Sequence, residues 1–87
     1  MNYRLILKPS AEKQLEHLTA AIQRRIVEKL ATIEAEPRGA GSVKLAGGRN
    51  CYRVRVGDYR IVYEVDDARK TVFVTIIAHR REVYRDL

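Results

Sequence analysis

Hydrophobic and polar residues alternate on both sides of a Gly57-Asp58 pair, over residues 51–64. Glycine accepts the positive φ angle of tight hairpin turns, so this pattern predicts two antiparallel strands joined by a two-residue loop. The predicted pairs are Val56 with Tyr59, Arg55 with Arg60, Val54 with Ile61, and Arg53 with Val62. Because side chains alternate across a sheet, one face carries Tyr52, Val54, Val56, Tyr59, Ile61 and Tyr63. The other face carries Arg53, Arg55 and Arg60, and we expect Arg60 to face solvent.

The segment before this hairpin predicts a short strand followed by two helices. Residues 3–7 are apolar and precede a proline, which is typical of a strand that ends there. Ser10 is the predicted N-cap of a short first helix, and Thr19 is the predicted N-cap of a longer one over residues 20–36. The apolar stripe of the longer helix is predicted to consist of Ile22, Ile26, Leu30 and Ile33, widened by Val27.

The remaining segments complete a small α+β fold. Residues 39–48 form a glycine-rich connection, and residues 71–78 form a nearly continuously apolar strand that we expect inside the sheet. The order β-α-α-β-β-β predicts one domain over residues 1–87, with two N-terminal helices packed on a mainly antiparallel, twisted four-stranded sheet. The expected core is Leu5, Leu7, Leu15, Leu18, Ile22, Ile26, Leu30, Ile33, Val54, Ile61, Tyr63, Val72, Val74 and Ile76.

Composition narrows the class of partner. The chain has 87 residues, 46% of them hydrophobic, and a net charge of +6, which favours a polyanionic partner. A single cysteine, Cys51, allows no internal disulfide, so nothing indicates a secreted scaffold. No run approaches the roughly 18 apolar residues of a membrane span, and the N-terminus lacks the pattern of a signal peptide. We therefore expect a cytoplasmic protein without a membrane partner.

The opposed arginines are the strongest indication of a binding site. Like charges directly opposite each other destabilise a sheet by roughly 0.2–1 kcal/mol, so pairing Arg55 with Arg60 has no structural benefit of its own. An alternative is an ordinary solvated face. Lys44 lies upstream in the chain, and further cations and an aromatic ring follow the last strand, at Arg80, Arg81, Tyr84 and Arg85. Arginines bind phosphate oxygens and aromatic rings stack on unpaired bases, so the pattern is compatible with a site for single-stranded RNA as well as with a solvated face.

Other chemistries receive little support from the sequence. His17 and His79 are far apart in the chain and lack ligand-like partners, so no metal site is predicted. No serine nucleophile motif or phosphate-binding loop is present, and no cofactor is expected. His79 is the one group near the basic tail whose ordinary pKa lies near neutrality, although a structural role is the more frequent one for such a histidine.

These residues together resemble the RelE branch of the RelE/ParE toxin superfamily. The resemblance is carried by Lys44-Leu45-Ala46-Gly47, by the hairpin from Tyr52 to Glu64, and by His79-Arg80-Arg81-Glu82-Val83-Tyr84-Arg85. It implies a toxin of a type II toxin–antitoxin pair that enters the ribosomal A site and cleaves mRNA. It also implies attack by the 2′-hydroxyl without a metal, a cognate acidic RelB-like antitoxin, and a complex that binds operator DNA.

The resemblance also implies roles for individual residues. It places Arg53, Arg55, Arg60, Arg81 and Tyr84 in the catalytic site, and Lys44, His79, Arg80 and Arg85 in RNA binding, with Arg80 as an alternative to Arg81. Some relatives carry lysines where Arg53 and Arg55 stand. Arginine, with a pKa above about 12, cannot act as a general base, so we assign both to phosphate binding and charge stabilisation. The proton acceptor stays open between Tyr84 and His79.

Two other functions are compatible with the sequence. A ParE-like inhibitor of DNA gyrase would share the fold but generally lacks this arginine cluster and the terminal tyrosine. A non-enzymatic module would use the basic face only to hold an acidic antitoxin. The endoribonuclease is the preferred interpretation because Arg53, Arg55, Arg60 and Tyr84 occur together.

Overall fold

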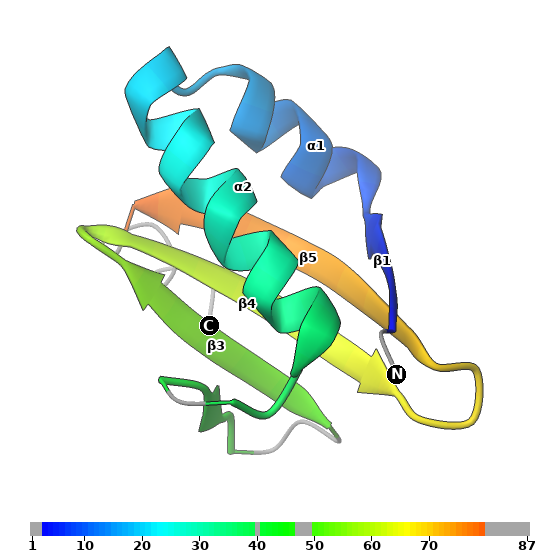
Figure 1. Cartoon of the computed structure of the whole chain (residues 1–87). Coiled ribbons are helices and arrows are strands. Elements are labelled where there is room, and N and C mark those ends of the chain that lie inside the picture. The colour runs from blue at the N-terminus through cyan, green and yellow to red at the C-terminus, as the bar shows by residue number, and fades with distance from the viewer. Residues whose placement is uncertain (1–2, 40, 47–49, 80–87) are drawn as a thin grey trace.

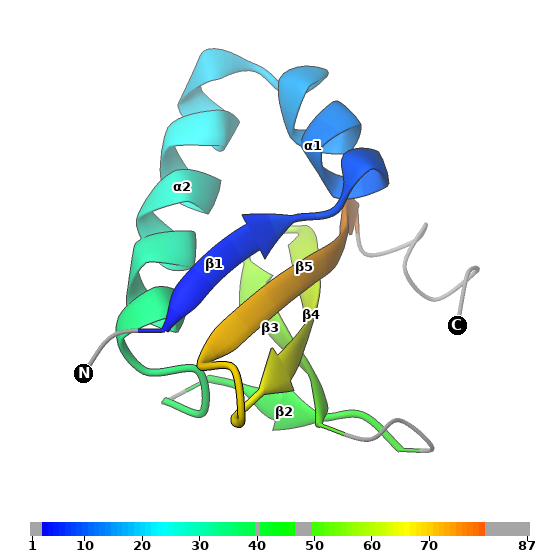
Figure 2. The same ribbon diagram turned by 90° about the vertical axis from the view of Figure 1, so that its right-hand side faces the viewer.

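The computed structural model describes residues 3–39, 41–46 and 50–79 and contains two helices packed on one face of a twisted sheet (Figures 1 and 2). The elements are β1 (Arg4–Leu7), α1 (Pro9–Glu16), α2 (Ala20–Ala35), β2 (Val43–Lys44), β3 (Cys51–Val56), β4 (Tyr59–Asp66) and β5 (Thr71–His79). The strand order across the sheet is β1-β5-β4-β3-β2. The β1 strand runs parallel to β5, and the other neighbours are antiparallel.

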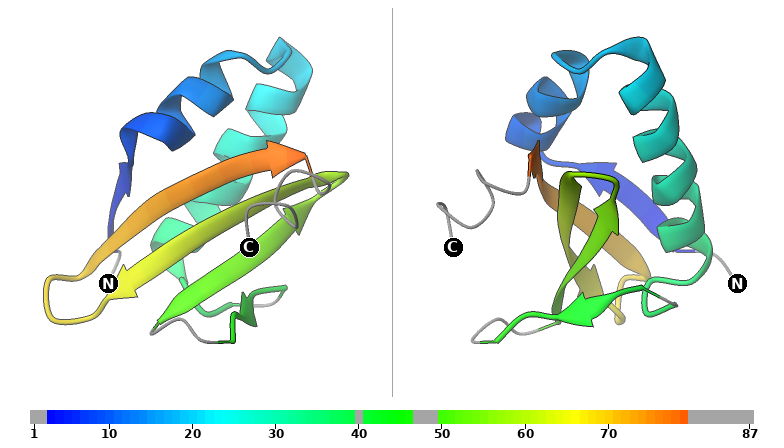
Figure 3. Two further views of the ribbon diagram at one scale, coloured as in Figure 1. Left: turned by 180° about the vertical axis from the view of Figure 1, so that it is seen from behind. Right: turned by 90° about the vertical axis from the view of Figure 1, so that its left-hand side faces the viewer.

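The predicted fold class is confirmed, with one added strand. Within the glycine-rich connection, Val43 and Lys44 pair with Arg53 and Tyr52 and extend the sheet to five strands. The β5 strand lies between β1 and β4, as expected for its nearly continuous apolar sequence. Both faces of the sheet are visible in Figure 3, where the helices cover only one of them.

The predicted N-cap is confirmed for α2 and is wrong for α1. The Thr19 hydroxyl accepts a hydrogen bond from the Ile22 backbone N–H at 3.4 Å and caps α2 as predicted. The α1 helix begins earlier than expected, with Lys8 at the N-cap and Pro9 in the first turn. Proline suits that place because its fixed φ is already helical and its missing N–H would have no partner there.

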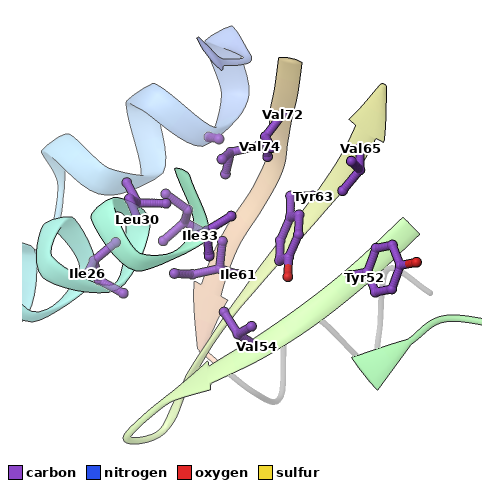
Figure 4. Packing of buried hydrophobic residues seen from close by; sticks show 12 residues of the cluster. Ile26, Leu30, Ile33, Tyr52, Val54, Ile61, Tyr63, Val65, Val72 and Val74 are labelled. Carbon is purple, nitrogen blue, oxygen red and sulfur yellow. The ribbon is translucent and has the colours of Figure 1, made fainter. Parts of the chain in front are cut away.

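The main core lies between α2 and the inner face of the sheet (Figure 4). The helix contributes Ile26, Leu30 and Ile33, all of which are buried. Tyr63 is 1% exposed, and its hydroxyl donates a 2.6 Å hydrogen bond to the Pro37 carbonyl, which satisfies the one polar atom that its ring brings into the core. The prediction that Val27 widens the apolar stripe is wrong, because this side chain is 52% exposed.

An irregularity in β5 changes which of its residues face the core. Tyr63 pairs with Val74 and Val62 pairs with Ile76, so Thr75 is an extra residue on β5. Its hydroxyl donates a 3.2 Å hydrogen bond to the Val62 carbonyl. A single inserted residue reverses the alternation of side chains beyond it. The core residue is therefore Ile77, which is 1% exposed, and the prediction of Ile76 is wrong.

Beyond the bulge, the outer face carries a second small apolar cluster. Val62 and Ala78 are buried in it, and Leu45 and Ile76 pack against them. Leu45 reaches this cluster from the segment after β2, where its backbone N–H donates to the Cys51 carbonyl at 2.9 Å. The outer face is therefore partly apolar next to the arginines.

An ion pair joins the segment after α2 to the β4–β5 turn. The Arg38 guanidinium donates to both carboxylate oxygens of Asp67, at 3.0 and 2.9 Å, and to the Tyr52 hydroxyl at 2.7 Å. Tyr3 donates a further hydrogen bond to Asp67 at 2.8 Å. The hydrogen bonds from Arg38 and Tyr3 lower the pKa of Asp67 to about 2.

Candidate active site

The β3–β4 hairpin has the predicted register. Arg55 pairs with Arg60, and Arg53 pairs with Val62. Gly57 begins the turn with a φ of +59°, a backbone conformation that residues with a Cβ rarely adopt. On one side of the turn, a Cβ at Gly57 would lie 3.1 Å from the Arg25 guanidinium of α2. On the other side, Arg55 donates through Nε to the Gly57 carbonyl at 3.3 Å.

Three arginines of the hairpin converge on one cavity. This cavity, which we call the arginine groove, has a volume of about 320 Å³. Its lining consists of Gly41, Val43, Arg53, Val54, Arg55 and Arg60. The volume falls in the range of about 300–1,000 Å³ that is typical of small-molecule sites. The structure therefore brings together the three hairpin arginines that the sequence assigned to one site.

Arg60 is more buried than the sequence suggested. We expected a solvent-facing side chain, but Arg60 is only 7% exposed. The sheet register explains the difference, because Arg60 lies between Arg55 on β3 and Ala78 on β5. The aliphatic stem of arginine packs well against apolar surface while the guanidinium stays at its edge. Ala78 of the second apolar cluster is the cross-strand neighbour of Arg60, and Arg60 is thereby more enclosed than Arg55, which is exposed.

The electrostatics of the groove favour an anion. Arg55 and Arg60 are direct cross-strand neighbours, and Arg53 follows on the same face of β3. Each guanidinium keeps its charge at any physiological pH and presents N–H groups in a planar fork that matches phosphate oxygens. A phosphate between them would reduce the repulsion between like charges and accept several charge-assisted hydrogen bonds.

Two other residues predicted to bind RNA lie on the opposite side of the sheet. Lys44 pairs with Tyr52, a core residue, so the two side chains share the helix-covered face, and Val43 takes the position beside Arg53. His79 pairs with Tyr59, and their rings make an edge-to-face contact with centroids 5.5 Å apart. The Thr75 bulge sets this orientation of His79. The structure therefore separates Lys44 and His79 from the arginine groove, and their roles in RNA binding stay predictions.

The tail residues of the predicted site, Arg80, Arg81, Tyr84 and Arg85, lie outside the described residues. Their catalytic and RNA-binding roles stay predictions. Within residues 3–39, 41–46 and 50–79, no group of three or more His, Cys, Asp or Glu side chains is arranged to hold a metal ion. In the same part of the chain, no helix is long and apolar enough to cross a membrane.

Sequence reasoning missed the contribution of Gly41 and Val43 to the groove. Both belong to the glycine-rich connection, where a strand of two residues leaves no alternating pattern to detect. Val43 is 48% exposed, so its side chain is not part of the core. Its position beside Arg53 gives the groove an apolar edge next to its cations.

Residues 5–84 match the family described as the ParE toxin of the type II toxin–antitoxin system parDE. The chain belongs to this toxin family. Among characterised relatives, the mRNA interferase toxin RelE of Escherichia coli is 31% identical over 99% of this chain and 94% of its own length. Toxin RelG of Mycobacterium tuberculosis is 28% identical over 98% and 99% of the two chains. The predicted resemblance to RelE-type toxins is confirmed.

Solved structures of such toxins have the same fold. The isolated E. coli RelE toxin superposes with a TM-score of 0.80 at 28% identity, covering 98% of this chain and 99% of that one. A chain of the archaeal RelE–RelB complex from Pyrococcus horikoshii gives 0.81 at 32% identity, with 92% and 97% covered. A chain of the intact E. coli RelBE toxin–antitoxin complex gives 0.79 at 30% identity, with 88% and 95% covered.

Proposed function

We propose that this chain is the toxin of a type II toxin–antitoxin pair and that it acts as an endoribonuclease on mRNA. The observation that carries the proposal is the convergence of Arg53, Arg55 and Arg60 on one groove of about 320 Å³. The similarity to a protein named mRNA interferase toxin RelE, which extends over 99% of this chain, supports mRNA as the substrate that binds in the groove. The proposed substrate is mRNA held in the A site of the ribosome.

The proposed reaction is a transesterification within the RNA strand. The 2′-hydroxyl attacks the adjacent phosphate, a bond forms between the 2′-oxygen and phosphorus, and the bond to the 5′-oxygen breaks. The products are a 2′,3′-cyclic phosphate and a 5′-hydroxyl, with a proton lost by the first oxygen and gained by the second. Negative charge grows on the phosphate during this step, and preorganised cations stabilise such charge. The proposed mechanism needs no metal because Arg53, Arg55 and Arg60 provide that stabilisation.

We divide this work among the three arginines according to their burial. Arg60 is nearly inaccessible and bordered by apolar side chains, so we assign it to the growing charge on the phosphate, where a fixed donor is most effective. Arg53 is half-buried and Arg55 is exposed at the mouth of the groove. We assign these two to capture and orientation of the RNA backbone, where a flexible side chain is sufficient.

The proton transfers require a group other than these arginines. Histidine is the most frequent general base in enzymes, but His79 shares the face of Tyr59 and not that of Arg60. A base must lie within hydrogen-bond reach of the proton that it removes. We therefore favour Tyr84 as the proton acceptor, with Arg81 or Arg80 as the tail cation. Dependence on the ribosome fits this weak set of acids and bases, because the ribosome can align the 2′-hydroxyl for attack.

We further propose an acidic, RelB-like antitoxin as the cognate partner. The net charge of +6 favours such a partner, and similar chains have been solved in complexes named RelBE or RelE–RelB. The toxin–antitoxin complex is proposed to bind operator DNA. A toxin that acts on ribosomes works in the cytoplasm, which is the location that we propose for this chain.

Inhibition of DNA gyrase is the second candidate function, because the matching family is described by the name ParE. The arginine groove argues against it, since stalling a topoisomerase does not require three cations around one cavity. A supercoiling assay with purified toxin separates the two activities. Stalled gyrase, without cleavage of RNA, would favour the second candidate.

The test of the main proposal maps the 5′ ends of a defined mRNA in a translation reaction, with and without ribosomes. We expect cuts at fixed positions within codons that appear only when ribosomes are present. The variant Arg55→Gln should lower the cleavage rate, because it removes an exposed cation at the groove without disturbing the core. Arg24→Gln is the matched control, because Arg24 is an exposed cation on α2. Equal rates for both variants would contradict the site assignment.

A further inference from the structure

A second cavity lies on the helix-covered side of the sheet, between the C-terminal end of α1 and the adjoining ends of β4 and β5. Its volume is about 390 Å³, and His17 and His79 both line it. We call it the histidine cavity. The two histidines are far apart in the sequence, and the fold brings them to one site. The groove that we assign to catalysis does not use this cavity, because it opens on the other face of the sheet.

The interior surface of the histidine cavity is apolar and aromatic. Leu18 and Ile77 contribute aliphatic surface, and Ile77 is also part of the core. Tyr59 and His79 contribute two rings that meet edge to face, with an interplanar angle of 80° and centroids 5.5 Å apart. Such a surface suits a flat, aromatic ligand that can stack on one ring and contact the other at its edge.

Hydrogen-bonding groups border this apolar surface. Gln14 is fixed in place because its side-chain oxygen accepts a 2.8 Å hydrogen bond from the Ile77 backbone N–H, which leaves its amide nitrogen as a donor. His17 is oriented by a 2.7 Å contact between Nδ1 and the Lys13 carbonyl, which leaves Nε2 as the atom for a ligand. Lys13 adds an exposed ammonium group at the rim. These groups can pair with the edge of a heterocycle.

The position of the cavity favours a base over a phosphate. It adjoins the C-terminal end of α1, where the helix dipole is negative and disfavours anions. A nucleobase is neutral, flat and rich in donors and acceptors, and proteins recognise unpaired bases by aromatic stacking together with hydrogen bonds to the base edges. The volume of about 390 Å³ is sufficient for such a small heterocycle.

We propose that the histidine cavity binds an unpaired base of the RNA strand whose phosphate occupies the arginine groove. The inference rests on the proposed function, and it extends the substrate site to a base-reading pocket. Tyr59 and Arg60 are consecutive residues whose side chains point to opposite faces of β4, with Cα atoms about 3.8 Å apart. An RNA strand that passes over this end of the sheet would therefore reach both the arginine groove and the histidine cavity. It would place one flanking base against Tyr59 and His17.

The test uses the four ribonucleosides as probes, because they carry a base but no phosphate. Amide chemical shifts of the full chain are followed by NMR during titration with each nucleoside, and ribose alone is the control for the sugar. We expect shifts centred on Gln14, His17 and Ile77, with a ranking among the four bases. The variant His17→Ala should weaken binding about 2- to 10-fold through loss of one hydrogen bond. Tyr59→Leu should weaken it at least 5-fold through loss of stacking.

Two control variants separate this inference from the proposed function. Glu16→Ala removes an exposed side chain on the same helical turn that does not line the cavity, and it should leave nucleoside affinity unchanged. Arg60→Gln should also leave it unchanged, and this result supports the base pocket whether or not that variant still cleaves mRNA. Shifts confined to the arginine groove, equal shifts with ribose, or unchanged affinity in both His17→Ala and Tyr59→Leu would overturn the inference.

Discussion

Replacement of Arg60 gives the most direct test of how the arginine groove works. Arg60 is 7% exposed and lies between Arg55 and Ala78, so the perturbation must remove the charge without emptying the space. Arg60→Gln keeps part of the stem and a polar end group. Arg60→Lys keeps the charge and removes only the planar fork of donors. Comparison of the two variants separates the contribution of charge from that of geometry.

The expected loss of activity is much larger than the expected change in stability. Removal of one preorganised donor to a developing oxyanion lowers kcat by about 100- to 1,000-fold in comparable sites, and we expect a loss of this order for Arg60→Gln. Arg60→Lys should be intermediate, with a loss of about 10-fold. Removal of the charge also relieves repulsion with Arg55 of roughly 0.2–1 kcal/mol, which opposes the lost packing of the stem. We therefore expect the free energy of unfolding to change by about 1 kcal/mol or less.

The assay measures single-turnover cleavage of mRNA on programmed ribosomes, together with denaturant unfolding of each purified variant. Arg24→Gln, an exposed charge change on α2, sets the baseline for non-specific effects of net charge. A cleavage rate for Arg60→Gln within about 3-fold of this control, at unchanged stability, would refute the assignment of Arg60 to charge stabilisation. A loss of activity that merely followed a loss of folded protein would refute the claim that its role is chemical.

Three further predictions concern the scaffold. The pKa of Asp67 is lowered to about 2, so its contribution to stability is present above its unfolded pKa of about 3.8 and is lost as pH falls through about 2. The difference in free energy of unfolding between the parent chain and Asp67→Asn, measured by circular dichroism, should therefore close over that pH interval. Burial and nearby Glu64 raise the pKa of the Cys51 thiol, so alkylation at pH 7 should be slow and should accelerate in Glu64→Gln. Gly57→Ala should lower the free energy of unfolding by about 1–2 kcal/mol, and Gly57→Val should lower it further, as measured by denaturant unfolding.

The hairpin could be predicted in detail because its register depends on local information. The Gly57-Asp58 turn fixes the loop length, and alternation on either side then fixes every pair from Val56–Tyr59 outward. The same logic placed three arginines on one face before any tertiary contact was known. The second helix could also be predicted from the sequence, because Thr19 specifies its start and a regular apolar spacing specifies its buried face.

The parts that could not be predicted depend on contacts between distant segments. The β2 strand has only two residues and exists because β3 offers it an edge, so its own sequence carries no signal. The burial of Arg60 depends on Ala78 and Val62 in neighbouring positions of the sheet, and alternation alone describes such a side chain as solvent-facing. Local pattern therefore gives the face on which a residue lies, and the cross-strand neighbours decide how deeply it is buried.

The Thr75 bulge has consequences for both cavities. Regular alternation from Val74 would have placed Ile76 in the core and His79 on the arginine face. One extra residue instead places Ala78 beside Arg60 and His79 beside Tyr59. A small alanine leaves room for the arginine stem, and His79, now on the helix-covered face, becomes part of the cavity against α1. The bulge thus lets one strand supply an apolar support to the proposed phosphate site and an aromatic wall to the proposed base pocket, on opposite faces of the same sheet.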